Sequence, residues 1–166
     1  MRVPRGTPAG PGRAARVPFV LRPLFEQNRA MEQARCEALK RELAAMPEPQ
    51  VVPIERFFDG NDDPASIGCN LAKHPGVQAF RDVLAGLRGK PGVEGVYAQI
   101  FEVDPGEEYW PFTDTVLVVG SIPATELRTA VRSLKPDEVH PVERDDVPPA
   151  IAEKHGSSPV LAVCWE

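Results

Sequence analysis

The stretch VQAFRDVLAGLRGKPGVEGVYAQIFEV, residues 77–103, decides the fold class of this chain. In its first half, apolar residues recur at steps of three and four, as they do on one face of a helix, and Gly89 then closes that helix. These apolar residues are Val77, Phe80, Leu84 and Leu87. In the second half, residues 93–103 alternate between two faces, which is typical of a strand. The stretch therefore predicts a fold that mixes helices with a sheet.

Segments on both sides of this stretch continue the pattern. Residues 24–46 predict a helix that Pro47 ends, and residues 51–58 predict a strand that Pro53 restricts to a sheet edge. Later in the chain, the sequence predicts a strand over 115–122, a helix over 123–134, a weak strand near Val139, a helical turn over 149–155 and a strand over 159–165.

The order of these elements predicts an α+β fold. Strand, helix, strand, strand, helix, strand is the split β-α-β pattern of ferredoxin-like domains. We therefore expect a ferredoxin-like sandwich with a mainly antiparallel sheet, helices on one face, and an extra N-terminal helix. Because 166 residues is near the usual size of one domain, we expect a single α+β domain over residues 24–166.

The N-terminal residues differ from the rest. Residues 1–23 consist mostly of Pro, Gly, Ala and Arg and have little to bury, so we expect a disordered basic tail. More ordinary sequence begins at Met31. This suggests the hypothesis that the native protein starts there and that residues 1–30 come from an overextended reading frame; whether they belong to the native protein stays open.

Charge is distributed unevenly along the chain. Residues 1–22 hold five arginines and no acid, which leaves 14 basic against 24 acidic side chains in the remainder, a formal charge of −10. An acidic body argues against a nucleic-acid-binding surface, which needs clustered Lys and Arg. It favours a partner with a basic surface.

The cysteines and the hydropathy indicate the setting. Cys36, Cys69 and Cys164 are odd in number and show no Cys-x-x-Cys spacing, so neither a disulfide framework nor a zinc site is indicated. No segment approaches the roughly 20 apolar residues of a membrane span. We expect reduced thiols, no membrane partner and a cytoplasmic location, while the oligomeric state is not indicated.

An acidic loop, FFDGNDDPASIGCN over residues 57–70, is the first candidate site. It places Asp59, Asp62 and Asp63 within five residues, and like charges at contact distance repel by about 1 kcal/mol even in water. We expect something to compensate them, and a helix N-terminus, a cation and a basic partner all remain open.

The same loop fits a calcium loop only in part. Asp59, Asn61 and Asp63 occupy positions one, three and five, but Pro64 and Asn70 stand where Gly and a bidentate Glu are needed. A structural interpretation has more support, in which the third aspartate caps a short turn that opens at the following proline. We therefore expect no metal ion.

Cys69 and His74 also invite an interpretation as nucleophile and base. A thiolate would need a base or a helix N-terminus to lower its pKa. No family-specific signature flanks Cys69, so a packed structural thiol is favoured. We expect no catalytic residue and no cofactor.

The segment 104–114 is the second candidate site. Its acids surround aromatic residues, a combination that suits a basic partner. Equally, the rings can fold back over the sheet edge while the acids face water, and both interpretations stay open. Together the two segments give the expected binding residues: Asp59, Asp62, Asp63, Glu107, Glu108, Tyr109, Trp110 and Asp114.

Three motifs carry a family resemblance. FFDGNDD at residues 57–63, SIGCN at 66–70 and WPFTD at 110–114 resemble an uncharacterised family of small bacterial α+β proteins. That resemblance implies no catalytic residue. More loosely, the size, acidity and α+β pattern are similar to those of cytosolic immunity proteins that neutralise partner toxins.

These observations favour a non-catalytic protein-binding module of a bacterial cytosol, immunity-type or regulatory, that docks a basic partner through an acidic and aromatic surface. Two alternatives stay open. One is a small metal-dependent hydrolase or other enzyme that uses Asp59, Asp62 and Asp63. The other is a ligand-sensing regulatory domain.

Overall fold

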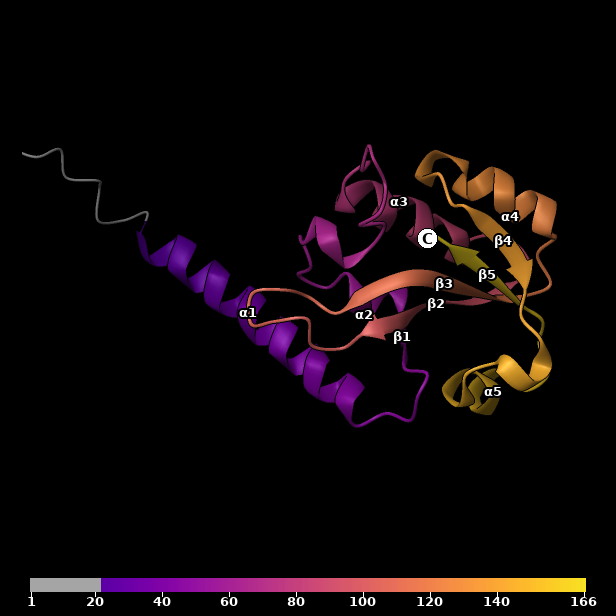
Figure 1. The fold of residues 1–166 in the computed structure, drawn as a ribbon, viewed down its shortest axis with the longest axis horizontal. Coiled ribbons are helices and arrows are strands. Elements are labelled where there is room, and N and C mark those ends of the chain that lie inside the picture. The colour runs from indigo at the N-terminus through magenta and orange to yellow at the C-terminus, as the bar shows by residue number, and fades with distance from the viewer. Residues whose placement is uncertain (1–21) are drawn as a thin grey trace, which may run out of the picture.

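The computed structural model describes residues 22–166, which fold around a five-stranded sheet (Figure 1). All paired strands are antiparallel and their order is β1-β2-β3-β5-β4. The strands are β1 (Val51–Pro53), β2 (Val93–Glu102), β3 (Phe112–Gly120), β4 (Glu138–Pro141) and β5 (Val160–Cys164). The helices are α1 (Arg22–Ala44), α2 (Ile54–Phe57), α3 (Val77–Arg88), α4 (Ala124–Val131) and α5 (Pro149–His155), with 3-10 turns η1 (Pro64–Ser66), η2 (Arg132–Leu134) and η3 (Arg144–Asp146).

The central strand β3 is covered on both faces. Val116 and Val118 point into the larger core, which also contains buried residues of α1, α2, α3 and α4. Leu117 and Val119 point into a smaller core with Ile151 of α5. Because successive side chains of a strand face opposite sides, burial on both faces explains why β3 reads as a continuous apolar run.

The mixed α+β architecture, the antiparallel sheet and the N-terminal helix are confirmed. The split β-α-β order is not: in that unit the two strands around the helix are parallel with a third strand between them, whereas β1 and β2 are direct antiparallel neighbours. The expectation of helices on one face also needs correction, because α5 packs on the opposite face from α3 and α4 (Figure 1).

The first strand is shorter than the predicted 51–58. It ends at Pro53, and the chain continues directly into α2. Ile54, Phe57 and Phe58 are all buried, at the three- and four-residue spacing of one helix face. Burial of this face against the core therefore outweighs the strand propensity of the segment.

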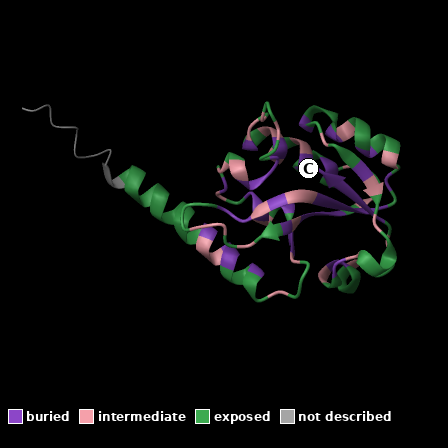
Figure 2. Cartoon of the chain, viewed as in Figure 1, coloured by how far each residue is buried: buried purple, intermediate pink, exposed green. Residues whose placement is uncertain are grey.

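Helix α1 joins the body only through its C-terminal part. Every residue from Leu24 to Arg35 is exposed, and this part of the helix extends away from the sheet (Figures 1 and 2). Cys36, Leu39 and Leu43 are buried in the larger core. The predicted tail, residues 1–23, lies outside the described residues apart from Arg22 and Pro23, which begin α1.

Among residues 22–166, no helix combines the length and the apolar character that crossing a membrane requires.

Candidate functional site

The acidic loop is folded around one buried amide. The Asn61 side chain is fully buried, and its Nδ2 donates to the Phe57 carbonyl (3.3 Å) and to the Ser66 hydroxyl (3.1 Å). Its Oδ1 accepts from the backbone N–H of Asp63 at 3.0 Å. Each polar atom of the amide therefore has a partner, as burial requires.

Asp63 caps the turn that follows. Its Oδ1 accepts from the Ala65 N–H at 2.9 Å, and Pro64 occupies the first position of η1. The residue after the turn, Ile67, is fully buried, and Gly68 then adopts a φ of 64°. The predicted cap and turn are confirmed.

The other two aspartates of the loop lie beside arginines of the same chain. Asp59 pairs with Arg35 of α1 at 3.3 Å, and Asp62 lies 4.0 Å from Arg81 of α3. Arg81 also donates to the carbonyl of Phe58 at 2.7 Å and to that of the buried asparagine at 3.0 Å. The charge crowding predicted from the sequence is thus compensated from within the fold.

The three aspartates do not converge on a common point. Within the described part of the chain, no group of three or more His, Cys, Asp or Glu side chains is placed to hold a metal ion. Cys69 is exposed rather than packed, which corrects the expectation of a structural thiol.

His74 does not serve as a base for the Cys69 thiol. The His74 Nδ1 accepts from the Gly76 N–H at 2.9 Å, so in the neutral ring the Nε2 carries the proton and donates to the Ile67 carbonyl at 2.7 Å. Both ring nitrogens are therefore committed to the backbone. The ring serves to position the segment between the acidic loop and α3.

The loop between β2 and β3, residues 103–111, docks on α1 through its backbone. Three side chains on one face of the helix donate to three carbonyls of this loop. The contacts are Gln33 Nε2 to Glu107 O (3.0 Å), Cys36 Sγ to Tyr109 O (3.5 Å) and Lys40 Nζ to Gly106 O (2.8 Å). Since the spacing of 33, 36 and 40 is helical, all three reach the loop from one side.

Lys40 is the buried member of this set, with 6% of its surface exposed, and it pairs with Asp104 at 3.0 Å. The hydrogen bond from Lys40 holds the pKa of Asp104 below its ordinary value. Burial lowers the pKa of Lys40, but the hydrogen bond to Asp104 and nearby negative charge outweigh it and leave that pKa raised. Burial likewise raises the pKa of the Cys36 thiol, which keeps it protonated as a donor.

An open cleft of about 530 Å³ lies where α1 and this loop diverge. Its lining residues are Arg29, Ala30, Glu32, Gln33, Cys36, Glu108 and Trp110. We call it the α1 cleft. Within residues 22–166, the carboxylates of Glu32, Glu107 and Glu108 form no ion pair, which sets them apart from Asp59 and Asp62.

The two aromatic residues of the β2–β3 loop are exposed to different degrees. Tyr109 is half-exposed, while Trp110 is only 7% exposed and belongs to the larger core. Of the two interpretations left open by the sequence, Trp110 follows the one in which the ring folds back into the protein, while Tyr109 faces water. Asp114 lies on β3, where its Oδ1 accepts from the Thr115 hydroxyl at 2.9 Å, and it does not line the cleft.

The acidic loop and the β2–β3 loop are neighbours in space. Asp63 Oδ2 accepts from the Trp110 N–H at 3.2 Å, and Ile67 forms a parallel bridge with Thr113. The sequence analysis treated these segments as two sites, and the structure brings them together through a side-chain-to-backbone hydrogen bond and a backbone bridge.

Comparison with known protein families matches residues 33–162 to the uncharacterised YfbO protein family. The chain belongs to this family. Comparisons with curated proteins and with solved structures gave no match. The expected membership of an uncharacterised family is confirmed. The part shared with the YfbO family begins at Gln33, the first residue of α1 that holds the β2–β3 loop.

Sequence reasoning missed the contribution of α1 to this site. Gln33 and Lys40 flank Cys36 on the helix, and Lys40 is buried although it is charged. The available signal was Lys40 itself, because it continues the apolar stripe of the helix at helical spacing. A lysine that is buried in this way needs a partner. Its partners lie in the β2–β3 loop, far along the chain.

Proposed function

We propose that this YfbO-family protein is a non-catalytic binding module that docks a protein partner with a basic surface at the α1 cleft. One observation carries the proposal. Glu32 and Glu108 line the cleft without an ion pair among residues 22–166, and Glu107 and the half-exposed Tyr109 are the chain neighbours of Glu108.

The electrostatics support a basic partner. Residues 23–166 carry a formal charge of −10, which speeds the encounter with a positively charged surface through long-range attraction. The carboxylates of Asp59 and Asp62 are partly neutralised by arginines of the chain. Those at the α1 cleft keep their charge available for an incoming group.

The shape of the cleft favours a long basic side chain as the inserted group. Ala30 and the small exposed parts of Cys36 and Trp110 offer apolar surface, whereas Glu32 and Glu108 offer negative charge and Arg29 a positive one. A lysine or arginine of the partner can lay its methylenes on the apolar surface while its charged end meets a carboxylate. Tyr109 then adds a ring at the edge of the contact, and tyrosine is common among residues that dominate binding energy.

The three free cysteines support a reducing compartment. We accordingly place the proposed interaction in a bacterial cytosol, with a regulatory or immunity-type role for the complex.

Site-specific photo-crosslinking in the native host tests the proposal. A photoreactive phenylalanine analogue at position 109 should give a discrete adduct with one protein, whose crosslinked segment carries Lys or Arg. The same analogue at Asp145, an exposed position in η3, is the matched control and should give no such adduct.

A second experiment removes negative charges of the β2–β3 loop. The double variant Glu107→Gln with Glu108→Gln should reduce the adduct at least about tenfold, because both carboxylates face the partner. Asp145→Asn with Asp146→Asn should leave it unchanged. Equal adducts at positions 109 and 145, or an adduct that survives the glutamate double variant, would count against the α1 cleft as the docking surface.

A further inference from the structure

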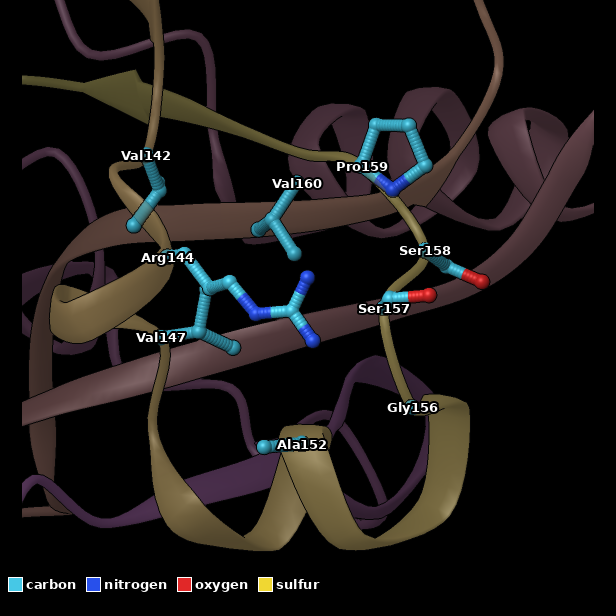
Figure 3. Close-up of a pocket in the computed structure, with 9 residues that line it drawn as sticks. All are labelled: Val142, Arg144, Val147, Ala152, Gly156, Ser157, Ser158, Pro159 and Val160. Atoms are coloured by element: carbon cyan, nitrogen blue, oxygen red, sulfur yellow. The ribbon is translucent and has the colours of Figure 1, made fainter.

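A second cleft lies on the opposite face of the sheet from α3, between α5, η3 and the start of β5 (Figure 3). It measures about 460 Å³. Its lining residues are Val142, Arg144, Val147, Ala152, Gly156, Ser157, Ser158, Pro159 and Val160. We call it the α5 cleft.

Arg144 is the one cationic side chain in this lining. Figure 3 shows its guanidinium directed across the cleft toward the Ser157–Ser158 segment. Within residues 22–166 this guanidinium has neither an ion pair nor a hydrogen bond, as is also true of Arg29, Arg41 and Arg132, and it differs from Arg41 in lining a cleft with apolar walls. A guanidinium carries five donors and stays charged at any physiological pH.

The rest of the lining divides into two kinds. Val142, Val147 and Val160 give apolar walls, and the Ser157–Ser158 segment forms the far edge, with both serine hydroxyl groups pointing away from Arg144 (Figure 3). Apolar walls combined with a charged group that points into the cleft, here Arg144, are typical of small-molecule sites. The planar fork of an arginine matches a carboxylate through two parallel hydrogen bonds.

We propose that the α5 cleft binds a small organic carboxylate, with the carboxylate on Arg144 and a short apolar chain against the valines. The site is separate from the α1 cleft, so the protein would carry a ligand site in addition to its partner site. This inference does not depend on the proposed function, and either can fail alone.

Titration with simple probes followed by NMR tests this assignment. Hexanoate, at a concentration raised to saturation, should shift the amide signals of residues 144 and 156–158. Hexan-1-ol supplies the same chain without the charge, and inorganic phosphate supplies charge without the chain. Hexan-1-ol should bind at least about tenfold more weakly than hexanoate because it lacks the charge-assisted hydrogen bonds to Arg144, and phosphate at least about tenfold more weakly because it has no chain to lay against the valines.

Two variants separate the contributions of charge and space. Arg144→Gln should abolish the preference for hexanoate over hexan-1-ol, whereas Arg132→Gln, an exposed arginine of η2, should keep it. Ala152→Leu keeps Arg144 but fills part of the cleft from α5, so it should weaken hexanoate binding without changing the preference.

The outcomes are distinguishable. Saturable shifts at residues 144 and 156–158 that require Arg144 support the site. No saturable shift with hexanoate, shifts unaffected by Arg144→Gln, or equal binding of phosphate and hexanoate would overturn it. Because Arg144 is exposed and makes no contact that the fold needs, an unchanged spectrum elsewhere is expected to verify that the variant is folded.

Discussion

Asp63 and Trp110 are joined by a hydrogen bond of 3.2 Å between the aspartate Oδ2 and the backbone N–H of the tryptophan, across 47 positions of sequence. The other oxygen of the same carboxylate caps η1 through the Ala65 N–H. One aspartate therefore fixes both the acidic loop and the base of the β2–β3 loop. In the proposed binding, Asp63 positions these two loops, while Glu107, Glu108 and Tyr109 form the binding surface.

The buried amide of Asn61 should be important for stability. Asn61→Ala removes two donors and one acceptor that serve Phe57, Asp63 and Ser66. Leaving buried partners unsatisfied costs about 1–3 kcal/mol, so the free energy of unfolding should fall by that amount. Urea denaturation measures it.

Asn70→Ala is the matched control, since Asn70 lies in the same loop but is exposed. Its effect should stay within about 0.5 kcal/mol. Equal losses in the two variants would refute the idea that the loop is built on the buried amide.

The ion pair between Lys40 and Asp104 should make stability depend on pH in a defined sense. The pKa of Asp104 is lowered in the folded protein by its hydrogen bond to Lys40, so its contribution is present above the ordinary pKa of 3.8 and is lost as the pH falls through the folded value. The pKa of Lys40 is raised, so its contribution is present below its ordinary 10.5 and is lost as the pH rises through the folded value.

Urea denaturation of the wild type and of Asp104→Asn across this range measures the effect. The difference in free energy of unfolding should be constant between the two ordinary pKa values and should shrink toward acid, because the wild type then loses the charge that the variant lacks. Asp145→Asn should show no such convergence. A difference that grows toward acid would contradict the assigned pair.

The three thiols should react at very different rates. Cys69 is exposed, while Cys36 and Cys164 are buried and burial raises the pKa of each of the two. Since the thiolate is the reactive form, a disulfide reagent such as DTNB should modify one thiol quickly in the folded protein and all three after denaturation.

Cys69→Ser should remove the fast reaction entirely. Rapid modification of Cys36 in that variant would mean that α1 leaves the β2–β3 loop on the timescale of labelling, and the α1 cleft would then not be a persistent surface.

The part of α1 before Met31 should be dispensable for folding. Leu24 to Arg35 bury no side chain, and the family match begins at Gln33. A chain shortened to begin at Met31 should therefore keep the melting temperature of the full chain, as measured by circular dichroism.

A chain shortened to begin at Arg41 is the control. It loses Cys36 and Leu39, which are buried, together with Lys40. Removing a buried leucine side chain alone costs about 2–5 kcal/mol, so this chain should melt at a clearly lower temperature or fail to fold. Similar losses in both shortened chains would show that residues before Met31 contribute to stability.

The sequence predicted the elements well wherever burial follows a local pattern. Val77, Phe80, Leu84 and Leu87, the face predicted for the second helix, are the buried residues of α3. The turn after Asp63 was also predictable, because capping depends on residues next to one another. In these cases the pattern and the energy that stabilises it belong to the same short segment.

The remaining features depend on contacts between distant segments. The strand order depends on the antiparallel pairing of β1 with β2. The local sequence of neither strand indicates which strand becomes its neighbour. Lys40 is buried because the β2–β3 loop supplies Asp104 and the Gly106 carbonyl. Likewise, only the fold reveals that Trp110 packs inside while its neighbour Tyr109 faces water.

The hydrogen bonds by which α1 holds the β2–β3 loop also affect how the sequence of the loop can evolve. Gln33, Cys36 and Lys40 all hold main-chain oxygens, which every amino acid possesses. Substitutions at positions 107–109 can therefore change the side chains that the loop displays while the three hydrogen bonds from α1 are kept. The exposed chemistry of this loop can in this way diverge during evolution without a change in the contacts that hold the loop in place.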